Sequence, residues 1–561
     1  MRLLNAHTRK LEEFADETEV EYAILSHRWE DEEVTFQDMH TPDKAHHMKG
    51  FAKILNSCEH AVNDGYDHVW VDTCCINKDS SAELSEAINS MFRWYKASAV
   101  CYAFLADVRA GAIDSDTEME HLRASKWFTR GWTLQELLAP QQVVLYDQHW
   151  EFLGTKQTLS AVLTLQTGID EVILNGGSLS SRSIAQRMSW ASERITKCKE
   201  DIAYCLLGIF DVNMPLLYGE GGEKAFLRLQ EEIIKQSDDH TIFAWPIQRH
   251  GQTGLLADSP KAFGGCQYTK PLLSRKGRSP YSLTNRGLSI KLLATPYSAD
   301  TYLVRLDCEN RLLPVQSDHT GELRLGMFLR RLYEDDQFGR ITIDGKTFVQ
   351  LSASTWVSKM SKPYSDFGVR DLLQRSMQPV EQLGINVRQV TNFNTNDYND
   401  RINGFRLATP DILKRSSSGQ NLFKVYAPQW DAQENIMSMK AGELGLVGYL
   451  DIGPQNRKIS IIKLGFDFEF NPVCFIATSG IHQLSPFDEL AWSEMSNGQA
   501  MELRQHPGLW ALKGDRVSGL IVRVGEVASL RILRGIIKGK LVWDVYLENV
   551  VKESMLRKLL K

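Results

Sequence analysis

Trp132 and Glu136 are the residues whose types and spacing most plainly suggest chemistry. They lie in the segment RGWTLQELLAP at helical spacing, so both side chains would project from one helix face, about one turn apart. A carboxylate there can stabilise positive charge that develops on a substrate, and an aromatic ring can stack on a planar group. A structural interpretation also fits, with Glu136 in a helix salt bridge to Arg130 and Trp132 packed in the core.

Polar and aromatic side chains also follow two predicted buried strands. In open α/β sheets, ligands bind at the carboxyl ends of parallel strands. His27 could be a general base or a hydrogen-bonded structural residue, and Asp72 could bind a ribose or cap the following turn. The candidate binding residues at these strand ends are Ser26, His27, Arg28, Trp29 and Asp72, with Asn77 as a secondary candidate.

Glu83 and Glu86, in the segment SSAELSEAI, are rival carboxylates to Glu136. Ser80 followed by Glu83 is typical of a helix N-terminus with a capping box, so Glu83 is predicted to have a structural role first. Cys75 could be nucleophilic only with a lowered pKa, and no His is adjacent, so a buried thiol is the preferred interpretation. The chain has no CxxC pair, and we predict no metal site.

The segment YGEGGEK, residues 218–224, leads into a predicted helix. A glycine-rich turn of this kind can bind a phosphate on its free backbone N–H groups. No buried strand precedes it, and no Ser or Thr follows Lys224, so it is not a P-loop. We therefore interpret it as a structural loop at the entry to a helix.

Short apolar runs and helical patterns alternate over roughly the first 150 residues, which predicts βαβ units and a mostly parallel sheet. The acidic stretch GAIDSDTEMEH is predicted to be an exposed loop, and Pro140 ends the helix that carries Glu136. The predicted strands are 22–26, 68–72, 100–105 and 143–146, and the predicted helices are 51–63, a helix from about 81, and 132–138.

The pattern is helical again over 183–236, and short alternating runs separated by turn residues follow Trp245. Such runs are typical of β-sandwiches or barrels, so we expect a β-rich C-terminal region. The predicted division is an effector domain at 1–160, a helical extension at 161–245, a β-rich module at 246–395, a possible linker at 396–420 and a second β-rich module at 421–561.

Composition excludes several classes of protein. The 561 residues are 43% hydrophobic and 24% charged, as in folded globular chains, and their number implies more than one domain. The net charge of −6 provides no basic footprint, so nucleic acid is not an expected partner. No apolar run is long enough to span a membrane, and the nine cysteines have no regular spacing. We expect a cytoplasmic protein in a reducing compartment.

Several long strings resemble one family. MRLLN, YAILSHRWEDEEVTFQDM, VWVDTCCINKDSSAELSEAINSMFRWYKASAVCYAFLADV and RGWTLQELLAP are similar to the heterokaryon-incompatibility (HET) domain of fungal proteins. The segment SWASERITKCKEDIAYCLLGIFDVNMPLLYGEGGEKAFLRLQEEI resembles the sequence that often follows this domain. Fuller architectures in the family add a nucleotide-binding module and repeats, but neither GxxxxGK[ST] nor a WD periodicity occurs here, so we expect sensing either to work differently or to involve a partner signalling protein.

The resemblance implies a TIR-like, flavodoxin-type fold and a role in fungal non-self recognition and programmed cell death. NAD-cleaving TIR domains carry a Trp-x-x-x-Glu pattern whose Glu is catalytic, which makes Glu136 the expected catalytic residue of an NAD glycohydrolase. NAD would be the substrate, with no resident cofactor. Trp29 or Trp132 would stack on a ring of NAD, and Arg28 and Arg130 would pair with its diphosphate.

TIR-like enzymes usually complete their site between protomers, so the resemblance also implies activity that depends on self-association. A non-enzymatic adaptor that signals by assembling with other such domains is the alternative, because fold does not determine function. A related N-glycosidase or base-exchange enzyme that acts on another nucleoside is a third possibility.

Overall fold

A computed structural model provides the fold. It describes residues 1–109, 116–247, 254–272, 280–298, 301–310, 323–331, 337–342, 346–352, 380–387, 403–408, 423–427, 429–439, 445–452, 460–466, 472–478, 509–511, 520–524, 528–537 and 540–548. Two compact units divide the chain: Met1–Pro246, Leu256–Leu283 and Asp307–Leu312 form the first, and the remainder forms the second. The finer division predicted from the sequence is not tested by this partition and stays a prediction.

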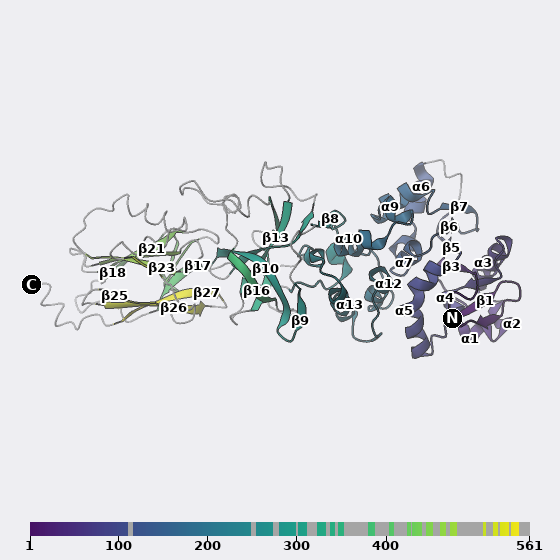
Figure 1. The fold of residues 1–561 in the computed structure, drawn as a ribbon, viewed down its shortest axis with the longest axis horizontal. Coiled ribbons are helices and arrows are strands. Elements are labelled where there is room, and N and C mark those ends of the chain that lie inside the picture. The colour runs from purple at the N-terminus through teal and green to yellow at the C-terminus, as the bar shows by residue number, and fades with distance from the viewer. Residues whose placement is uncertain are drawn as a thin grey trace, which may run out of the picture. The chain divides into compact units, whose positions relative to one another are not determined.

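The first unit is built on a mixed sheet with helices (Figure 1). Among the described residues its strands follow the order β2-β1-β4-β3-β5-β6-β7. Strand β3 pairs in parallel with β4 and β5, and β5 pairs in parallel with β6, whereas β1, β2 and β7 are antiparallel. The bounds are β1 Arg2–Asn5, β2 Leu11–Glu13, β3 Ala23–His27, β4 His68–Trp70, β5 Val100–Phe104, β6 Val143–Tyr146 and β7 Phe152–Thr155.

The parallel strands agree with the sequence because each is a short, continuous apolar run. Every residue of β3 and β5 is buried, as expected for central strands that are covered on both faces. The antiparallel strands β1, β2 and β7 were not predicted. Strands β2 and β7 are the two edges of the sheet, where shorter and more polar runs are tolerated, and β1 is a four-residue strand between β2 and β4.

Helices connect the parallel strands, and the two longest of them before β6, α3 and α5, bury one side. In α5, for example, Ile88, Met91 and Tyr95 are buried at helical spacing, whereas Leu84 is half-buried. The helices before β6 are α1 Phe36–Met39, α2 Pro42–Ala45, α3 Phe51–Asn63, α4 Asp72–Cys75, α5 Ser81–Ala97, α6 Asp116–Arg123, the 3-10 turn η1 Lys126–Thr129, and α7 Thr133–Leu138.

Helix α6 corrects the prediction of a loop over the acidic stretch. Residues 111–115 lie outside the described residues, but Asp116–Arg123 is helical. Its acidic residues precede His121 and Arg123 along the helix, an order that suits the helix dipole, and Leu122 is buried. The many charged residues of this stretch favoured a loop in the sequence-based prediction.

The helical extension continues the first unit. Its elements are α8 Ser160–Thr167, α9 Glu171–Leu174, η2 Leu179–Ser181, α10 Ile184–Ser189, α11 Asp201–Tyr204, α12 Leu207–Phe210, α13 Gly222–Gln236, η3 His240–Phe243 and η4 Pro260–Phe263. Helix α12 packs closely on α5, because a Cβ at Gly208 would lie 2.0 Å from Cβ of Phe92. The short strands β8 Thr269–Pro271 and β12 Cys308–Asn310 pair with each other in this unit.

The described residues after Leu283 are strand-rich, as predicted. One sheet holds β9 Ser282–Thr284, β10 Gly287–Ser298, β11 Thr301–Arg305, β13 Leu323–Arg331, β14 Gln337–Ile341, β15 Phe348–Ser352 and β16 Val380–Val387. A second holds β17 Asn403–Leu407, β19 Gln429–Asp431, β20 Ile436–Met439, β25 Leu520–Val524, β26 Ala528–Ile537 and β27 Lys540–Glu548. A third holds β18 Phe423–Tyr426, β21 Gly445–Ile452, β22 Ser460–Phe466, β23 Pro472–Thr478 and β24 Leu509–Ala511.

Strand β17 falls inside the range 396–420 that the sequence suggested as a linker. It pairs with β20 and, in parallel, with β27. The rest of that range, apart from Ala408, lies outside the described residues.

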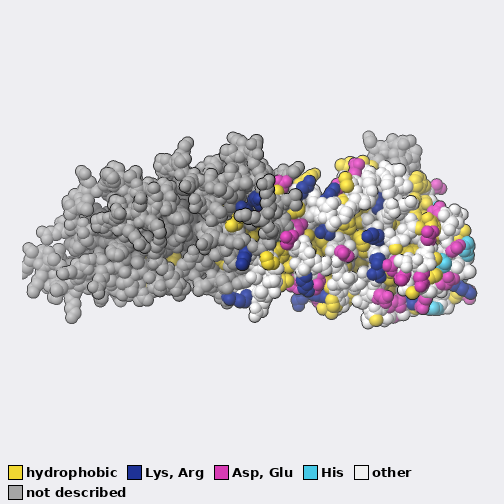
Figure 2. All heavy atoms as spheres, in the orientation of Figure 1, with side chains coloured by type: hydrophobic (Ala, Val, Ile, Leu, Met, Phe, Trp, Pro, Cys, Tyr) yellow, Lys and Arg dark blue, Asp and Glu magenta, His cyan; other side chains and the backbone are white. Residues whose placement is uncertain are grey.

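The charge distribution is mixed on the face of the first unit that Figure 2 shows, where Lys and Arg side chains are interspersed with Asp and Glu. Within the described residues, no helix is both long enough and apolar enough to cross a membrane.

Candidate functional site

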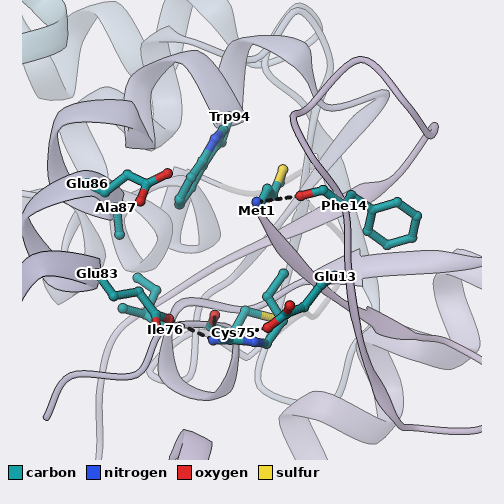
Figure 3. Close-up of a pocket in the computed structure, with 10 residues that line it drawn as sticks. Met1, Glu13, Phe14, Cys75, Ile76, Glu83, Glu86, Ala87 and Trp94 are labelled. Carbon is teal, nitrogen blue, oxygen red and sulfur yellow. Dashed lines mark hydrogen bonds and ion pairs between the residues drawn. The ribbon is translucent and has the colours of Figure 1, made fainter. Parts of the chain in front are cut away.

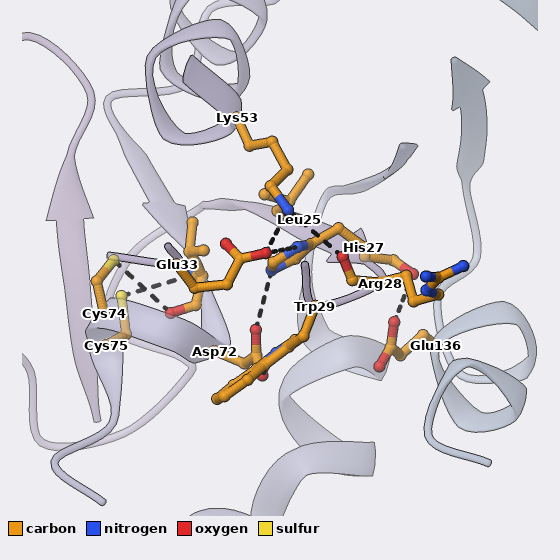
Figure 4. A network of polar contacts seen from close by, with 12 residues as sticks. Leu25, His27, Arg28, Trp29, Glu33, Lys53, Asp72, Cys74, Cys75 and Glu136 are labelled. Carbon is orange, nitrogen blue, oxygen red and sulfur yellow. Dashed lines mark hydrogen bonds and ion pairs between the residues drawn. The ribbon is translucent and has the colours of Figure 1, made fainter. Parts of the chain in front are cut away.

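Glu136 lies on α7 and points toward the carboxyl end of β3. It is 7% exposed, and its Oε2 accepts a hydrogen bond from Oγ of Ser26 at 2.5 Å (Figure 4). The indole Nε1 of Trp127 in turn donates to Oγ of Ser26 at 3.0 Å. Because an indole N–H can only donate, the Ser26 hydroxyl keeps its own proton available for Glu136. This series of hydrogen bonds, from Trp127 to Ser26 to Glu136, directs a hydroxyl donor at the buried carboxyl group.

Burial controls the protonation of Glu136. Desolvation raises the pKa of its carboxyl group to about 8, and the negative charge of Asp72 acts in the same direction. The hydrogen bond from Ser26 and the charges of Arg130 and Arg194 oppose this rise only in part. Glu136 therefore changes charge close to neutral pH, which is the range in which a catalytic carboxyl group is most useful.

Residues of the helical extension hold the N-terminal end of α7. The buried Arg194 donates through Nη1 to the carbonyl of Arg130 at 2.8 Å and to Oγ1 of Thr133 at 3.0 Å. The backbone around Arg130 also forms a parallel bridge with Ile195. A Cβ at Gly131 would lie 2.5 Å from Cγ2 of Thr196, so only glycine allows this close approach.

The C-terminal end of α7 is held by Lys156. This lysine is 1% exposed, and its Nζ donates to the carbonyls of Leu137 at 3.2 Å and Pro140 at 2.5 Å. The carbonyl of Leu137 is one that the end of a helix leaves without an intrahelical partner, and Pro140 lies just beyond that end. Both ends of the helix that carries Glu136 are therefore fixed by residues from outside it.

His27 and Asp72 join the ends of β3 and β4. Nε2 of His27 lies 3.2 Å from Oδ1 of Asp72, and Nε1 of Trp29 donates to Oδ2 at 2.8 Å (Figure 4). Burial alone would raise the pKa of Asp72. The nearby Lys78 charge and the hydrogen bonds from His27 and Trp29 outweigh that effect and hold the pKa well below its ordinary value. Asp72 is therefore ionised, in contrast to Glu136.

A second carboxylate approaches His27 from the other side. Oε1 of Glu33 lies 3.9 Å from Nδ1 of His27, and Glu33 also forms a short ion pair with the buried Lys53. Nζ of Lys53 donates further to the carbonyl of Arg28 at 3.4 Å. His27 thus lies between two carboxylates, and the loop after β3 is tied to α3, which carries Lys53.

The rival carboxylates lie around a different pocket. This pocket encloses about 230 Å³ and is lined by Met1, Arg2, Glu13, Phe14, Cys75, Ile76, Glu83, Glu86, Ala87 and Trp94. Figure 3 shows Glu83 and Glu86 on one wall, with Met1 and Glu13 across from them. Neither Ser26 nor Glu136 is among its lining residues.

The residues of this pocket have structural contacts. Arg2 pairs with Glu83 at 2.7 Å, and the N–H of Asn77 donates to the same carboxylate at 2.8 Å. Ser80 caps α5 by accepting from the Glu83 N–H at 3.4 Å, as predicted, but the Glu83 carboxylate turns to Arg2 and Asn77. The predicted reciprocal capping box is therefore only half formed. Cys75 is 3% exposed, as the interpretation as a buried thiol requires.

The glycine-rich loop before α13 is occupied from within the chain. Oε1 of Glu200 accepts from the N–H of Gly219 at 3.0 Å and of Gly221 at 2.9 Å. Both glycines have positive φ, 102° and 88°, which most side chains avoid. A carboxylate of the same chain thus fills the position where a phosphate would bind, which agrees with the structural interpretation of this loop.

The structure gives Trp132 and Glu136 separate partners, and it does not contain the Glu136–Arg130 salt bridge that was one interpretation of the sequence. Trp132 donates from Nε1 to Oδ2 of Asp201 at 3.1 Å, whereas Glu136 bonds Ser26, so the two side chains do not share a partner. Arg130 affects the pKa of Glu136 through its charge, but among the described residues it forms no salt bridge with Glu136. Helical spacing could not predict these partners, because they come from distant segments.

Four further residues were missed, namely Trp127, Lys156, Arg194 and Lys78. Trp127 donates to Ser26, Lys156 and Arg194 hold α7, and Lys78 lies beside Asp72. Only Trp127 carried a usable signal, as an aromatic residue shortly before the Glu136 helix. An isolated lysine or arginine in the sequence looks like any solvated surface charge.

Comparisons with known proteins agree on one family. The family described as "Heterokaryon incompatibility protein (HET)" matches residues 22–114, which contain β3, β4 and β5 but end before Glu136. The "Vegetative incompatibility protein HET-E-1" of Podospora anserina is 46% identical over 250 residues. That alignment covers 42% of this chain, and it spans only 18% of the relative. No solved structure matches the chain.

Proposed function

We propose, from the match of residues 22–114 to the HET family, that the first unit is an effector of fungal non-self recognition that cleaves NAD. The bond broken would be the one between nicotinamide and ribose, and Glu136 would be the catalytic residue. The name of the Podospora relative, a vegetative incompatibility protein, supports the biological setting. It does not bear on the chemistry.

The buried Glu136 at the carboxyl end of β3 is the observation that carries the proposal. Glu136 is 7% exposed, and its carboxyl group is bonded to Ser26 and half ionised near pH 8. The parallel strands follow the order β4-β3-β5-β6, which is the doubly wound order in which ligands bind at the carboxyl strand ends. This order supports the TIR-like interpretation of the fold.

The reaction needs little acid catalysis. The C1'–N bond breaks, its electron pair returns to the pyridinium nitrogen, and neutral nicotinamide leaves. Water then attacks C1' and loses a proton, which leaves ADP-ribose. Ionised Glu136 would stabilise the positive charge that develops at C1'. A cationic substrate beside Glu136 would itself lower the pKa of this carboxyl group and so favour the active form.

Two guanidinium groups are available for the diphosphate. Arg28 and Arg130 are half-buried near Ser26 and Glu136, and neither makes an ion pair with a described side chain. A guanidinium matches phosphate oxygens bidentately. We assign these two residues to the diphosphate of NAD, and Trp132 to the wall of the site, where Asp201 fixes its ring.

Self-association would allow the substrate to reach Glu136. Because Glu136 is only 7% exposed, a substrate can reach it only after the surrounding loops move. Contact between protomers can favour such an open state through its binding energy. We therefore propose activity that increases on assembly.

The same burial also favours one alternative. In this alternative, the buried carboxyl group of Glu136, bonded to Ser26 beside Trp127, has a purely structural role and fixes α7 against β3. The domain would then be a non-enzymatic adaptor that signals by assembling with a partner.

Nicotinamide release separates the two functions. The full chain, with and without a crowding agent that promotes assembly, is incubated with NAD beside Glu136→Gln and Glu83→Gln variants. We expect release by the full chain and by Glu83→Gln, and loss of at least about 100-fold in Glu136→Gln. Absence of release under every assembling condition favours the adaptor, and equal release by Glu136→Gln removes Glu136 from its role. Thermal unfolding of each variant shows whether a loss reflects instability.

A further inference from the structure

Lys78 holds its ammonium group over the indole face of Trp29. Nζ lies 3.4 Å from the centroid of the ring and 3.7 Å from Oδ2 of Asp72. Nε1 of Trp29 donates to that same Oδ2 at 2.8 Å, which fixes the indole plane relative to the carboxylate. The position of the Lys78 ammonium group therefore lies close to both an aromatic face and a carboxylate oxygen.

This combination favours positive charge rather than apolar surface. The face of an indole attracts a cation through the ring quadrupole. The other oxygen of Asp72 is engaged by His27 at 3.2 Å, so Oδ2 is the one directed toward the Trp29 side. Asp72 is ionised, because its pKa is held low. A neutral ring would gain the stacking but not the attraction to the carboxylate.

The ammonium group of Lys78 can move away from its position between Trp29 and Asp72. It lies between α4 and α5 on a flexible four-carbon stem, and its side chain is 33% exposed. Burial lowers the pKa of its ammonium group, which shows that the group loses hydration where it lies. Moving into water restores that hydration. Trp29 is 39% exposed, so its ring face is accessible once the lysine moves.

We infer that Trp29 and Asp72 form a subsite for a planar organic cation, and that Lys78 occupies the position of that cation until it is displaced. On the proposed function, which this step presupposes, the cation is the pyridinium ring of NAD. The adenine end would then extend away from Trp29. Asp72 contacts His27, and His27 directly follows Ser26, the partner of Glu136, so the subsite lies at the same strand end as that carboxyl group.

Binding of 1-methylnicotinamide to the full chain tests the subsite without any turnover. Neutral nicotinamide is the matched probe, because it has the same ring and amide but no permanent charge. Calorimetric titration should show the cation binding at least about tenfold more tightly than the neutral amide. Lys78→Ala removes the competing ammonium group and should tighten cation binding about threefold to tenfold.

Lys235→Ala is the control for net charge. Lys235 lies on α13, is 63% exposed and pairs only with Glu232 among the described residues, so its loss should leave cation binding unchanged. Trp29→Leu should abolish binding of the cation. Equal binding of both probes would overturn the subsite, and so would a Lys78→Ala affinity no tighter than that of Lys235→Ala.

The two proposals fail separately. If 1-methylnicotinamide binds as expected but NAD releases no nicotinamide, the NAD-cleaving function is wrong and the cation subsite stands. If NAD is cleaved while Lys78→Ala changes neither the affinity for the cation nor the KM for NAD, the subsite is wrong and the function stands.

Discussion

At the scale of single residues, Glu136 and Asp72 are two carboxyl groups of one strand-end cluster with opposite protonation. Desolvation dominates at Glu136, whereas Lys78, His27 and Trp29 keep Asp72 ionised. Environments that separate two pKa values in this way are typical of acid and base assignments in active sites. The two groups can therefore serve different purposes in one reaction.

The pH dependence of NAD cleavage should report Glu136. Only its ionised form stabilises a cationic transition state, so kcat/KM should rise with pH through about 8 and then level off. Ser26→Ala removes a hydrogen bond that lowers the pKa, so the rise should move to higher pH. Initial rates of nicotinamide release across pH 6–10 measure both profiles. An unchanged profile in Ser26→Ala would argue against this assignment.

Stability should depend on pH through the same carboxyl group. The pKa of Glu136 is about 8 in the fold against 4.5 for an ordinary Glu, so the folded state binds the proton more tightly. Its contribution is fully present below about pH 4.5 and is lost as pH rises through about 8. Glu136→Gln lacks this loss, so it should gain stability relative to the unmodified chain between pH 5 and 9, by about 1–4 kcal/mol.

Glu83→Gln provides a control of opposite sign for the thermal unfolding measurements. Burial alone would raise the pKa of Glu83, but the hydrogen bonds from Arg2 and Asn77 lower it overall. Its contribution to stability is therefore present at neutral pH and is lost as pH falls. Glu83→Gln should be less stable than the unmodified chain at neutral pH, and this difference in the free energy of unfolding should shrink toward acid pH. Unlike Glu136→Gln, it should not become more stable than the unmodified chain at alkaline pH.

At the scale of elements, α7 depends on contacts at both of its ends. Arg194 holds the start of the helix and Lys156 holds its end, and both are buried. A six-residue helix is too short to be stable by itself, so its position comes from these tertiary contacts. The geometry of Glu136 is therefore a property of several segments together.

Gly131→Ala tests the packing at the start of α7. Its Cβ would lie 2.5 Å from Thr196 and 3.0 Å from Sγ of Cys205, so we expect a loss of about 1–3 kcal/mol in the free energy of unfolding. Gly264→Ala is the control, because its nearest neighbour would be 3.4 Å away and its φ is −53°. Denaturant titration measures the free energy of unfolding of both variants. Equal stabilities would show that the segment around Thr196 can move to accommodate the added Cβ without cost.

At the scale of the whole molecule, the helical extension belongs to the same compact unit as the N-terminal sheet. It provides Arg194, Asp201 and the close contact of Gly208 with Phe92 on α5. The HET family match ends at residue 114, before α7 and before all of these contacts. The described structure thus contains a larger cooperative unit than the match itself.

Two fragments test this larger unit. Residues 1–312 contain everything assigned to the first unit, so this fragment should unfold in one cooperative thermal transition. Residues 1–160 lack Arg194, which holds the start of α7, and α12, which packs on α5, so they should show no cooperative transition. Circular dichroism during heating distinguishes the two, and cooperative unfolding of 1–160 would show that the extension is dispensable.

The local elements of the first unit were largely readable from the sequence. The strand at 143–146 was predicted with the observed bounds of β6, because a short apolar run between turn residues has few alternatives. Helix α3 was also predicted with its observed bounds. Strands β2 and β7 were not, because edge strands do not need a continuous apolar run.

The sequence by itself determined that Glu136 lies on a short helix near a strand end and that the chain resembles HET proteins. Only the tertiary structure decided its partner, its burial and hence its charge. Ser26 is 110 positions away in the sequence, and Arg194, whose charge also acts on Glu136, lies beyond the next two strands. Periodicity reports which face of an element is covered, but a pKa depends on what covers it, and that is known only once distant segments have packed together.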